Sequence, residues 1–304
     1  MHDNDHPIDE LIHMYVDGSV GRRHMVREIA KYTGSVAAAI AAVRSSGMLV
    51  AQTRDACPAD VKVPENAPDI ETRNVQYPGE TGGTVFGYLA WPRSQTPQTY
   101  PGVLVLHENR GLVEHIKDVT RRVARAGFVG LGVDMLSSQG GTDQFPDAAQ
   151  QSAAFNRTTP QTRIEDIYAS LGFLKRQPQT QWDSIGCLGF CSGGGDAARF
   201  AAGTEELKAA VVFYGNPVPP VDQFNTLNAA LLLIYGEADR NLTGRLPPVL
   251  TAFLERRKTF GLHVYDGAGH AFHNDTSPNY NRTGACDAWN RTIDWFNRYL
   301  KRPA

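Results

Sequence analysis

Beyond about residue 70 the chain alternates between short apolar runs and longer segments with helical periodicity. The apolar runs have the length of strands covered on both faces, and they lie at 102–107, 128–134, 184–190, 209–214, 230–236 and 262–265. Helical periodicity occurs at 115–127, 162–176, 192–202, 246–260 and 285–300. Strands separated by helices are typical of right-handed βαβ units. The pattern therefore predicts one doubly wound α/β domain with a mostly parallel sheet and helices on both faces.

The organisation of the chain changes at about residue 70. Strands at 72–77 and 84–91 flank a glycine-rich turn, which predicts a hairpin at the start of the main domain, 71–304. The preceding part, 1–70, holds two expected helices, at 8–16 and 22–46, and then a polar stretch with three prolines. Proline lacks a backbone donor and favours extended geometry, so this stretch is interpreted as a linker or a wrapping segment. We therefore predict an N-terminal helical extension at 1–70.

The N-terminal extension allows two interpretations. Arg22 and Arg23 precede a small, apolar stretch at 34–43, as in a degenerate or functional twin-arginine export signal. Arg44 interrupts the apolar region, and no clean A-x-A cleavage site follows it. The other interpretation is an amphipathic extension that packs on the main domain. The first expectation for the compartment is cytoplasmic, with the periplasm as the alternative.

Composition and charge exclude several classes of protein. Of 304 residues, 41% are hydrophobic and 20% are charged, which is the balance of a folded globular chain. Lysine and arginine total 30 against 32 acidic residues, so a basic footprint for nucleic acid is absent. No apolar run is long enough for a membrane span. The four cysteines lack CxxC spacing, which argues against structural zinc, and we expect Cys57 and Cys286 to be free thiols unless the chain is exported.

The sharpest local signal is the sequence Gly-Phe-Cys-Ser-Gly at 189–193, between a predicted strand and a predicted helix. It corresponds to the G-x-S-x-G nucleophile elbow with Cys191 in place of serine. Gly189 and Gly193 lack a Cβ, which allows the chain to cross itself closely at this turn. The helix N-terminus favours a thiolate and offers amides to an oxyanion. The competing interpretation is a structural glycine-rich turn around a buried cysteine.

A nucleophile of this kind needs a base and an orienting acid, which follow in the order acid and then histidine in such folds. Asp239 comes directly after the strand at 230–236, and His270 follows the strand at 262–265. Both therefore fall at strand carboxyl ends, where α/β sites are built. Glu237 remains an alternative acid. His273 is interpreted as a rim residue.

Three other histidines and one cysteine are interpreted as structural. His107 ends a strand and is expected to be buried, whereas His24 and His115 are expected on solvated helical faces. Cys187 lies on the same predicted strand as the elbow and is expected in the core.

The loop after the strand at 102–107 supplies further candidates. In this fold that loop provides the second oxyanion amide, so Asn109 N–H and Ser192 N–H are the predicted donors. Glu108 is a carboxylate beside a cysteine nucleophile. It can accept the thiol proton, or hold the thiol protonated until substrate displaces it.

These motifs together resemble the dienelactone hydrolase family within the α/β-hydrolases, over roughly residues 71–300. The resemblance implies an α/β-hydrolase fold and a Cys191–His270–Asp239 triad that attacks an ester or lactone carbonyl. It also implies that Glu108 helps to activate the cysteine when substrate binds. Relatives with similar motifs often carry twin-arginine extensions, which favours the export interpretation.

The chain departs from the family pattern in the residues that bind the carboxylate of the substrate. Founding members bind it with arginines, one of them four residues after the catalytic histidine, where this chain has Asn274. Arg110, Tyr214 and Phe272 are, with Asn274, the predicted substrate contacts. We therefore expect hydrolase chemistry without dienelactone itself as the preferred substrate.

The sequence thus predicts a cysteine-dependent hydrolase of a small ester or lactone that works through a thioester acyl-enzyme. We expect no metal and no organic cofactor, no nucleic-acid partner and no membrane span. A homo-oligomer stays open. Two alternatives from other classes also remain: a redox-responsive thiol protein that uses Cys191, and a non-catalytic binding protein with an α/β-hydrolase-like fold.

Overall fold

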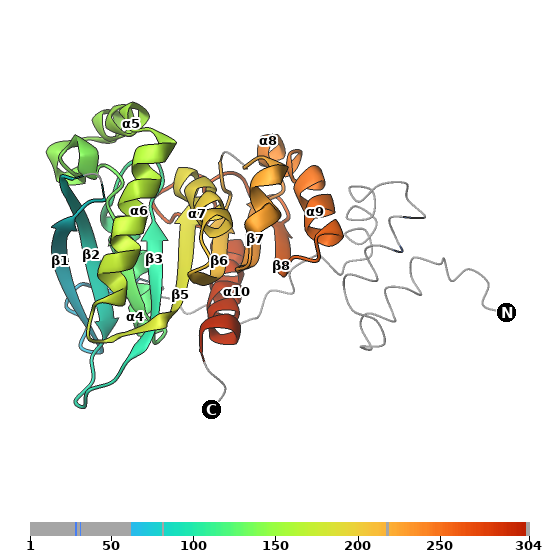
Figure 1. Cartoon of the computed structure of the whole chain (residues 1–304). Coiled ribbons are helices and arrows are strands. Elements are labelled where there is room, and N and C mark those ends of the chain that lie inside the picture. The colour runs from blue at the N-terminus through green and yellow to red at the C-terminus, as the bar shows by residue number, and fades with distance from the viewer. Residues whose placement is uncertain (1–27, 29–30, 32–61, 81, 217–218, 302–304) are drawn as a thin grey trace.

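The computed structural model describes residues 28, 31, 62–80, 82–216 and 219–301 (Figure 1). The expected helix at 8–16 lies outside these residues, and so does nearly all of the one at 22–46. The interpretation of the extension as an export signal or as a packed helical segment therefore stays a prediction. Among the described residues, no helix has the length and hydropathy needed to cross a bilayer.

Within the described residues the eight strands are β1 (Ile70–Pro78), β2 (Thr84–Pro92), β3 (Tyr100–Leu106), β4 (Val129–Val133), β5 (Thr180–Phe190), β6 (Leu207–Phe213), β7 (Ala230–Gly236) and β8 (Phe260–Tyr265). The α-helices are α4 (Glu114–Arg125), α5 (Ala148–Arg157), α6 (Pro160–Lys175), α7 (Ser192–Gly203), α8 (Arg240–Thr243), α9 (Leu246–Glu255) and α10 (Arg282–Leu300). Three short 3-10 helices lie at η1 (Ser137–Gln139), η2 (Thr142–Gln144) and η3 (Val221–Thr226).

All eight strands form one sheet in the order β1-β2-β4-β3-β5-β6-β7-β8. The predicted hairpin of β1 and β2 is confirmed, and β2 also runs antiparallel to β4. From β4 to β8 every neighbouring pair is parallel. The predicted α/β class with a mostly parallel sheet is therefore confirmed, and the carboxyl ends of six parallel strands meet at one edge.

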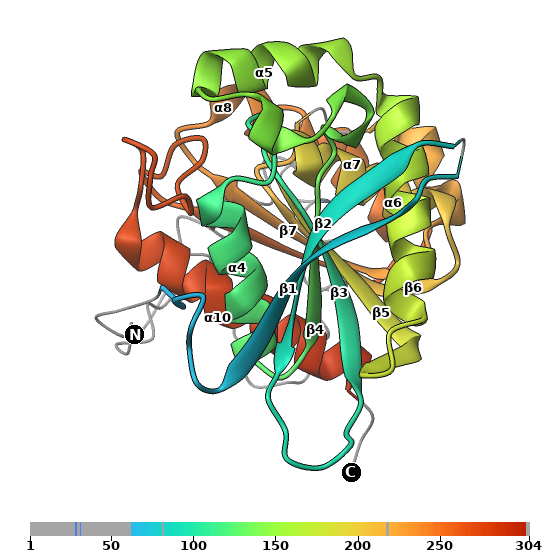
Figure 2. The same cartoon turned by 90° about the vertical axis from the view of Figure 1, so that its left-hand side faces the viewer.

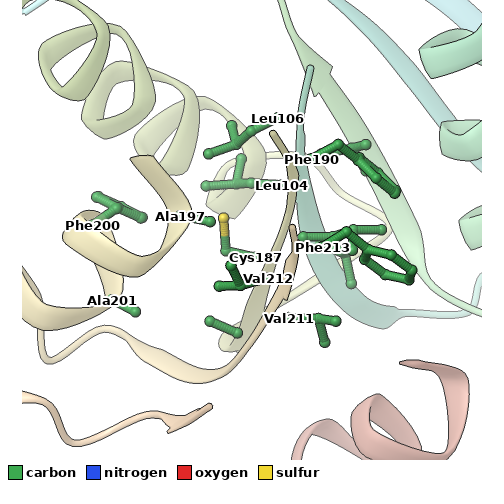
Figure 3. Packing of buried hydrophobic residues seen from close by; sticks show 14 of the residues in the cluster. Leu104, Leu106, Cys187, Phe190, Ala197, Phe200, Ala201, Val211, Val212 and Phe213 are labelled. Atoms are coloured by element: carbon green, nitrogen blue, oxygen red, sulfur yellow. The ribbon is translucent and has the colours of Figure 1, made fainter. Parts of the chain in front are cut away.

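Helices cover both faces of this sheet. Figures 1 and 2 show α4 and α10 on one face and α6 and α7 on the other. Figure 3 shows how α7 packs on β5 and β6, with Ala197 of the helix beside Cys187 and Val212 of the strands. Cys187 is fully buried, as expected, and burial raises the pKa of its thiol.

Helices α5 and α8 and the short 3-10 helices were not expected, and one expected helix is shorter. Helix α5 was not expected, although its alanine and glutamine residues favour a helix, and it buries only Ala154 and Phe155. Its N-terminus is capped by Asp147, whose side chain accepts from Gln150 N–H. The helix expected at 246–260 ends at Glu255, because Phe260 already belongs to β8.

The segment at 62–69 packs on the main domain ahead of β1. Val63 and Ala67 are buried, and Val63 N–H donates to Asp118 Oδ1 at 2.7 Å. Arg121 Nε donates back to Val63 O at 2.5 Å. These contacts join the segment at 62–69 to α4, whereas the interpretation of the whole polar stretch as a linker or a wrapping segment stays a prediction. The boundary at residue 70 itself stays a prediction, although β1 begins there.

Candidate active site

Five candidate residues meet at the carboxyl edge of the sheet. Cys191 directly follows β5, Tyr214 follows β6, Asp239 follows β7 and His270 follows β8, while Glu108 lies just beyond β3. Because parallel strands end at the same edge, residues far apart in the sequence come together there.

The turn that carries Cys191 is a strained elbow. The backbone of Cys191 has φ 51° and ψ −117°, a conformation that residues other than glycine rarely adopt. A Cβ on Gly189 would lie 2.1 Å from Gly193 O, and a Cβ on Gly193 would lie 2.3 Å from His107 O. Both glycines are therefore required by close backbone approach, as the sequence motif predicts.

A line of contacts runs from the sulfur to a carboxylate. His270 Nε2 lies 3.1 Å from Cys191 Sγ, and His270 Nδ1 lies 2.6 Å from Asp239 Oδ2. Burial opposes the charged imidazolium, but the contacts with Cys191 and Asp239 outweigh it and raise the pKa of His270 to about 9. The alternative acid, Glu237, uses its N–H to bond Tyr265 O, and the imidazole contact goes to Asp239.

The carboxylate of Glu108 faces two neutral donors. Tyr214 Oη donates to Glu108 Oε1 at 3.3 Å, and Asn274 Nδ2 donates to Glu108 Oε2 at 2.8 Å. The orientation of the Asn274 amide is defined, because Thr276 donates to Asn274 Oδ1 from both its N–H and its hydroxyl, at 2.9 and 2.7 Å. The sulfur of Cys191 meets His270 Nε2 and, at 3.9 Å, Ser192 Oγ. Thus Tyr214 and Asn274, predicted as substrate contacts, hold the acidic side chain.

The remaining predicted site residues occupy different environments. Phe272 is fully buried and packs against Tyr214 and Tyr265, with ring centroids 5.7 and 5.2 Å apart. Arg110 and Asn109 are exposed in the loop after β3. Phe272 therefore supports Tyr214 from behind, whereas the loop residues border solvent.

Two histidines differ from the sequence interpretation. His273 is buried rather than on the rim, and it stacks on Phe190 with ring centroids 5.2 Å apart. Burial holds the pKa of His273 well below its usual value. His115 is also buried rather than solvated, and its Nδ1 lies 3.0 Å from Asp275 Oδ1. Both interpretations failed because helical position or neighbouring charge does not reveal which distant loop covers a side chain.

Two residues of the loop after β8 were missed altogether. Asp275 pairs with His115 and also with Lys62 and Arg122, at 3.2 and 3.7 Å. Asn279 Nδ2 donates to His270 O at 3.0 Å. Asparagine and aspartate are common in any loop, so nothing local distinguishes these two. Their partners lie elsewhere in the chain.

The cysteines and potential metal ligands complete the chemistry of the site. Within the described part of the chain, no three His, Cys, Asp or Glu side chains gather in a group fit to hold a metal ion. Cys187 and Cys191 are free thiols. Cys286 is disulfide-bonded, so the expectation of a free thiol there is wrong, whereas Cys57 lies outside the described residues.

Comparison with known proteins shows which family this chain resembles. Residues 85–300 match the model of the dienelactone hydrolase family. A protein of Methylorubrum extorquens named as a carboxymethylenebutenolidase is 33% identical over 71% of this chain and 78% of its own length. A Bradyrhizobium protein named as a 2-oxo-3-(5-oxofuran-2-ylidene)propanoate lactonase is 30% identical over 73% of this chain and 92% of its own. A crystal structure from Klebsiella pneumoniae, named as a dienelactone hydrolase, superposes with a TM-score of 0.69 at 27% identity, covering 76% and 99% of the two chains.

The sheet order and the elbow place the protein among the α/β-hydrolases. Within that class, the chain belongs to the dienelactone hydrolase family. It is accordingly an enzyme, a hydrolase of the carboxylic ester class.

Proposed function

We propose that this enzyme hydrolyses small esters or lactones with Cys191 as nucleophile, His270 as acid and base, and Asp239 as the group that orients the imidazole. The observation that carries the proposal is the contact line from Cys191 Sγ through His270 to Asp239, which starts at the strained elbow. Such a line is the arrangement that nucleophilic acyl transfer needs.

In the proposed reaction the sulfur attacks the acyl carbon while His270 holds the thiol proton. The carbonyl π electrons move to oxygen, and the oxyanion is bound by Ser192 N–H and Asn109 N–H. As the carbonyl re-forms, the ester C–O bond breaks and the leaving alkoxide takes the proton from His270 Nε2. Water then gives a proton to His270 and attacks the thioester carbon. Breakage of the C–S bond releases the acid, and the thiolate stays paired with the imidazolium.

For Glu108 we propose an assisting role. Its carboxylate is held by the hydroxyl of Tyr214 and the amide of Asn274, both neutral donors. Hydrogen bonds to neutral groups are weaker than ion pairs, so substrate can displace them. The carboxylate is then free to turn towards the thiol and to accept its proton.

The substrate class follows from relatives and from the site together. The Bradyrhizobium relative is named for a lactone that itself carries a carboxylate, so it supports the lactone class but not the charge of the substrate. Asn274 stands where founding family members carry an arginine for the substrate carboxylate, and here its amide is occupied by Glu108. An uncharged ester or lactone therefore fits this site better than an anionic one.

For the compartment we propose an oxidising one, which is the exported alternative of the two expectations. The disulfide at Cys286 supports this, because disulfides persist mainly outside the reducing cytosol. The test is to isolate the protein from its natural host, unfold it, and count its free thiols with and without reductant. The same count in both conditions would favour the cytoplasm.

The central test is hydrolysis of p-nitrophenyl acetate by Cys191→Ala beside a matched control, Cys187→Ala. Cys187 is a thiol of the same strand, buried away from the edge. We expect Cys191→Ala to lose about 10⁴-fold or more in kcat/KM, whereas Cys187→Ala keeps activity. An acetyl adduct on Cys191, detected by mass spectrometry after rapid quench, would support the thioester. Retained turnover in Cys191→Ala would contradict the proposal, and peroxide oxidation of Cys191 without any turnover would favour the redox alternative.

A further inference from the structure

The two proposed oxyanion donors belong to two peptide groups, Cys191–Ser192 and Glu108–Asn109. In a trans peptide the carbonyl and the following N–H point in opposite directions. An N–H can therefore be aimed into the site by fixing the carbonyl of the same peptide on the other side. The question is what fixes each carbonyl.

The backbone alone fixes the first peptide. Cys191 O accepts from Gly195 N–H at 3.0 Å and from Asn216 N–H at 2.9 Å. Two donors from two different segments hold this carbonyl, so the direction of Ser192 N–H is redundantly determined.

The second peptide depends on one side chain. Glu108 O lies 2.5 Å from Nδ1 of His107, at the end of β3. On the other side of the same ring, Met135 N–H donates to His107 Nε2 at 2.9 Å. Since Nε2 accepts, it carries the lone pair and the ring proton sits on Nδ1, where it is donated to Glu108 O. The tautomer of His107 thus couples β4 to the loop after β3.

The surroundings keep this imidazole neutral and in place. His107 is fully buried, and burial holds its pKa below the usual value. Asp134 Oδ1 lies 3.8 Å from Nε2 and Asp134 is itself bonded by Thr142 N–H and Thr142 Oγ1, while the charges of Asp196 and Arg163 act on the ring in opposite directions. His107 O also accepts from Gly193 N–H at 3.1 Å, which ties the same residue to the elbow.

We propose that His107 is a positioning residue for the hydrolysis: its Nδ1–H fixes the Glu108 carbonyl and so aims Asn109 N–H at the oxyanion. This inference rests on the proposed function of Cys191. It predicts that His107 acts on the transition state rather than on substrate binding or on the reactivity of the sulfur.

Two substitutions separate the two ring contacts. In His107→Asn the amide nitrogen replaces Nδ1 and can still donate to Glu108 O, while the acceptor for Met135 N–H is lost. In His107→Gln the amide oxygen reaches the position of Nε2 and can accept from Met135 N–H, while the donor to Glu108 O is lost. If the two variants differ in activity, the cause is the lost donor to Glu108 O. If they lose activity equally, the cause is the general packing of the site.

We expect His107→Gln to lower kcat for p-nitrophenyl acetate about 10- to 100-fold, with KM within about twofold, because a lost oxyanion donor costs up to about 10³-fold. His107→Asn should stay within about threefold of wild type. Inhibition by butanal, whose carbonyl becomes an oxyanion on addition of the thiol, should weaken in parallel with kcat in His107→Gln. Alkylation of Cys191 by iodoacetamide forms no oxyanion and should keep its rate.

Several outcomes would overturn the inference. One is wild-type turnover in His107→Gln, and another is an alkylation rate that falls in the same proportion as kcat. If the Gln variant does not fold, the ¹⁵N shifts of His107 in the wild-type protein decide the matter, since a proton on Nε2 between pH 6 and 9 would contradict it. The proposed function is tested separately: an active Cys191→Ala would overturn that function, whereas an inactive Cys191→Ala with an active His107→Gln would overturn only the role of His107.

Discussion

The elbow around Cys191 and the loop after β8 each bring one side chain to the same place, but they are held differently. Backbone groups hold the elbow: Cys191 N–H donates to Phe213 O at 3.0 Å, and Gly193 N–H donates to His107 O at 3.1 Å. The loop also has backbone hydrogen bonds, as from Asn281 N–H to Phe272 O at 2.9 Å, but side chains add to them: Asn279 bonds His270 O, and Asp275 pairs with His115 of α4.

This difference teaches how each region should respond to mutation. The elbow depends on the absence of side chains, because backbone approaches backbone within a distance that excludes a Cβ. The loop depends on the presence of particular side chains, each of which supplies part of the support. A substitution in the elbow should therefore either abolish activity or leave it unchanged, whereas substitutions in the loop should lower activity by different, smaller factors.

The largest effect is expected for Gly189→Ala. The new Cβ would lie 2.1 Å from Gly193 O, so either the strand or the helix start must move. We expect kcat/KM for p-nitrophenyl acetate to fall about 10³-fold or more, because misplacing the nucleophile costs orientation as well as oxyanion binding.

The matched control is Gly203→Ala, at the C-terminus of α7, the helix that follows the elbow. Its Cβ would meet only Tyr168 Oη, at 3.6 Å, which is ordinary contact. This variant should keep wild-type activity. Near-normal activity in Gly189→Ala would break the contrast between the two regions.

An intermediate effect is expected for Asn274→Ala in the loop. The change removes the 2.8 Å hydrogen bond to Glu108 and the acceptor for Thr276, so the carboxylate loses its better-defined partner. We expect kcat/KM to fall about tenfold, the size of one hydrogen bond to a charged group, because Glu108 then has no single orientation from which substrate can recruit it. Thr276→Val removes only one of the two bonds to Asn274 Oδ1 and should change activity less. If both variants kept full activity, the support of Glu108 by this loop would be refuted.

The smallest effect on activity is expected for Asp275→Asn, with a clearer effect on stability. The hydrogen bond from His115 is the main cause that holds the pKa of Asp275 well below its usual value, although burial opposes it. A lowered pKa means that folding favours the carboxylate. This stabilisation is present above the ordinary pKa of about 4 and is lost as the pH falls below it.

Urea unfolding at pH 7 and pH 3 measures how much the Asp275 carboxylate stabilises the folded state. Asp275→Asn should be less stable than wild type by about 1–2 kcal/mol at pH 7, and the gap should shrink at pH 3. Activity at pH 7 should fall only about two- to threefold, because other contacts still hold the loop. The exposed Asp143→Asn serves as control and should show no gap at either pH. A gap that widens in acid would contradict the assigned sign.

Much of the fold could be predicted from the sequence because its determinants are local. Apolar runs predict β3 to β8, since burial on both faces leaves a continuous apolar pattern, and helical periodicity predicts α4, α6, α7, α9 and α10. The elbow was equally readable, because the strain at Cys191 and the close approach at Gly189 demand glycines at fixed spacing. Helices α5 and α8 were missed: α5 buries only Ala154 and Phe155, and α8 has only 4 residues.

The partners of the site residues were decided only by the tertiary structure. Asn274 and Glu108 bond across 166 positions of the chain, and His115 and Asp275 across 160. A hydrogen bond between such residues depends on which strands end side by side, and no local pattern encodes it. The sequence by itself therefore determined the sheet, the elbow and the types of residue available for chemistry. Only the folded chain decided that Glu108 faces Tyr214 and Asn274, and that His107 holds the peptide beside it, because those contacts exist only once the carboxyl ends of the strands have met.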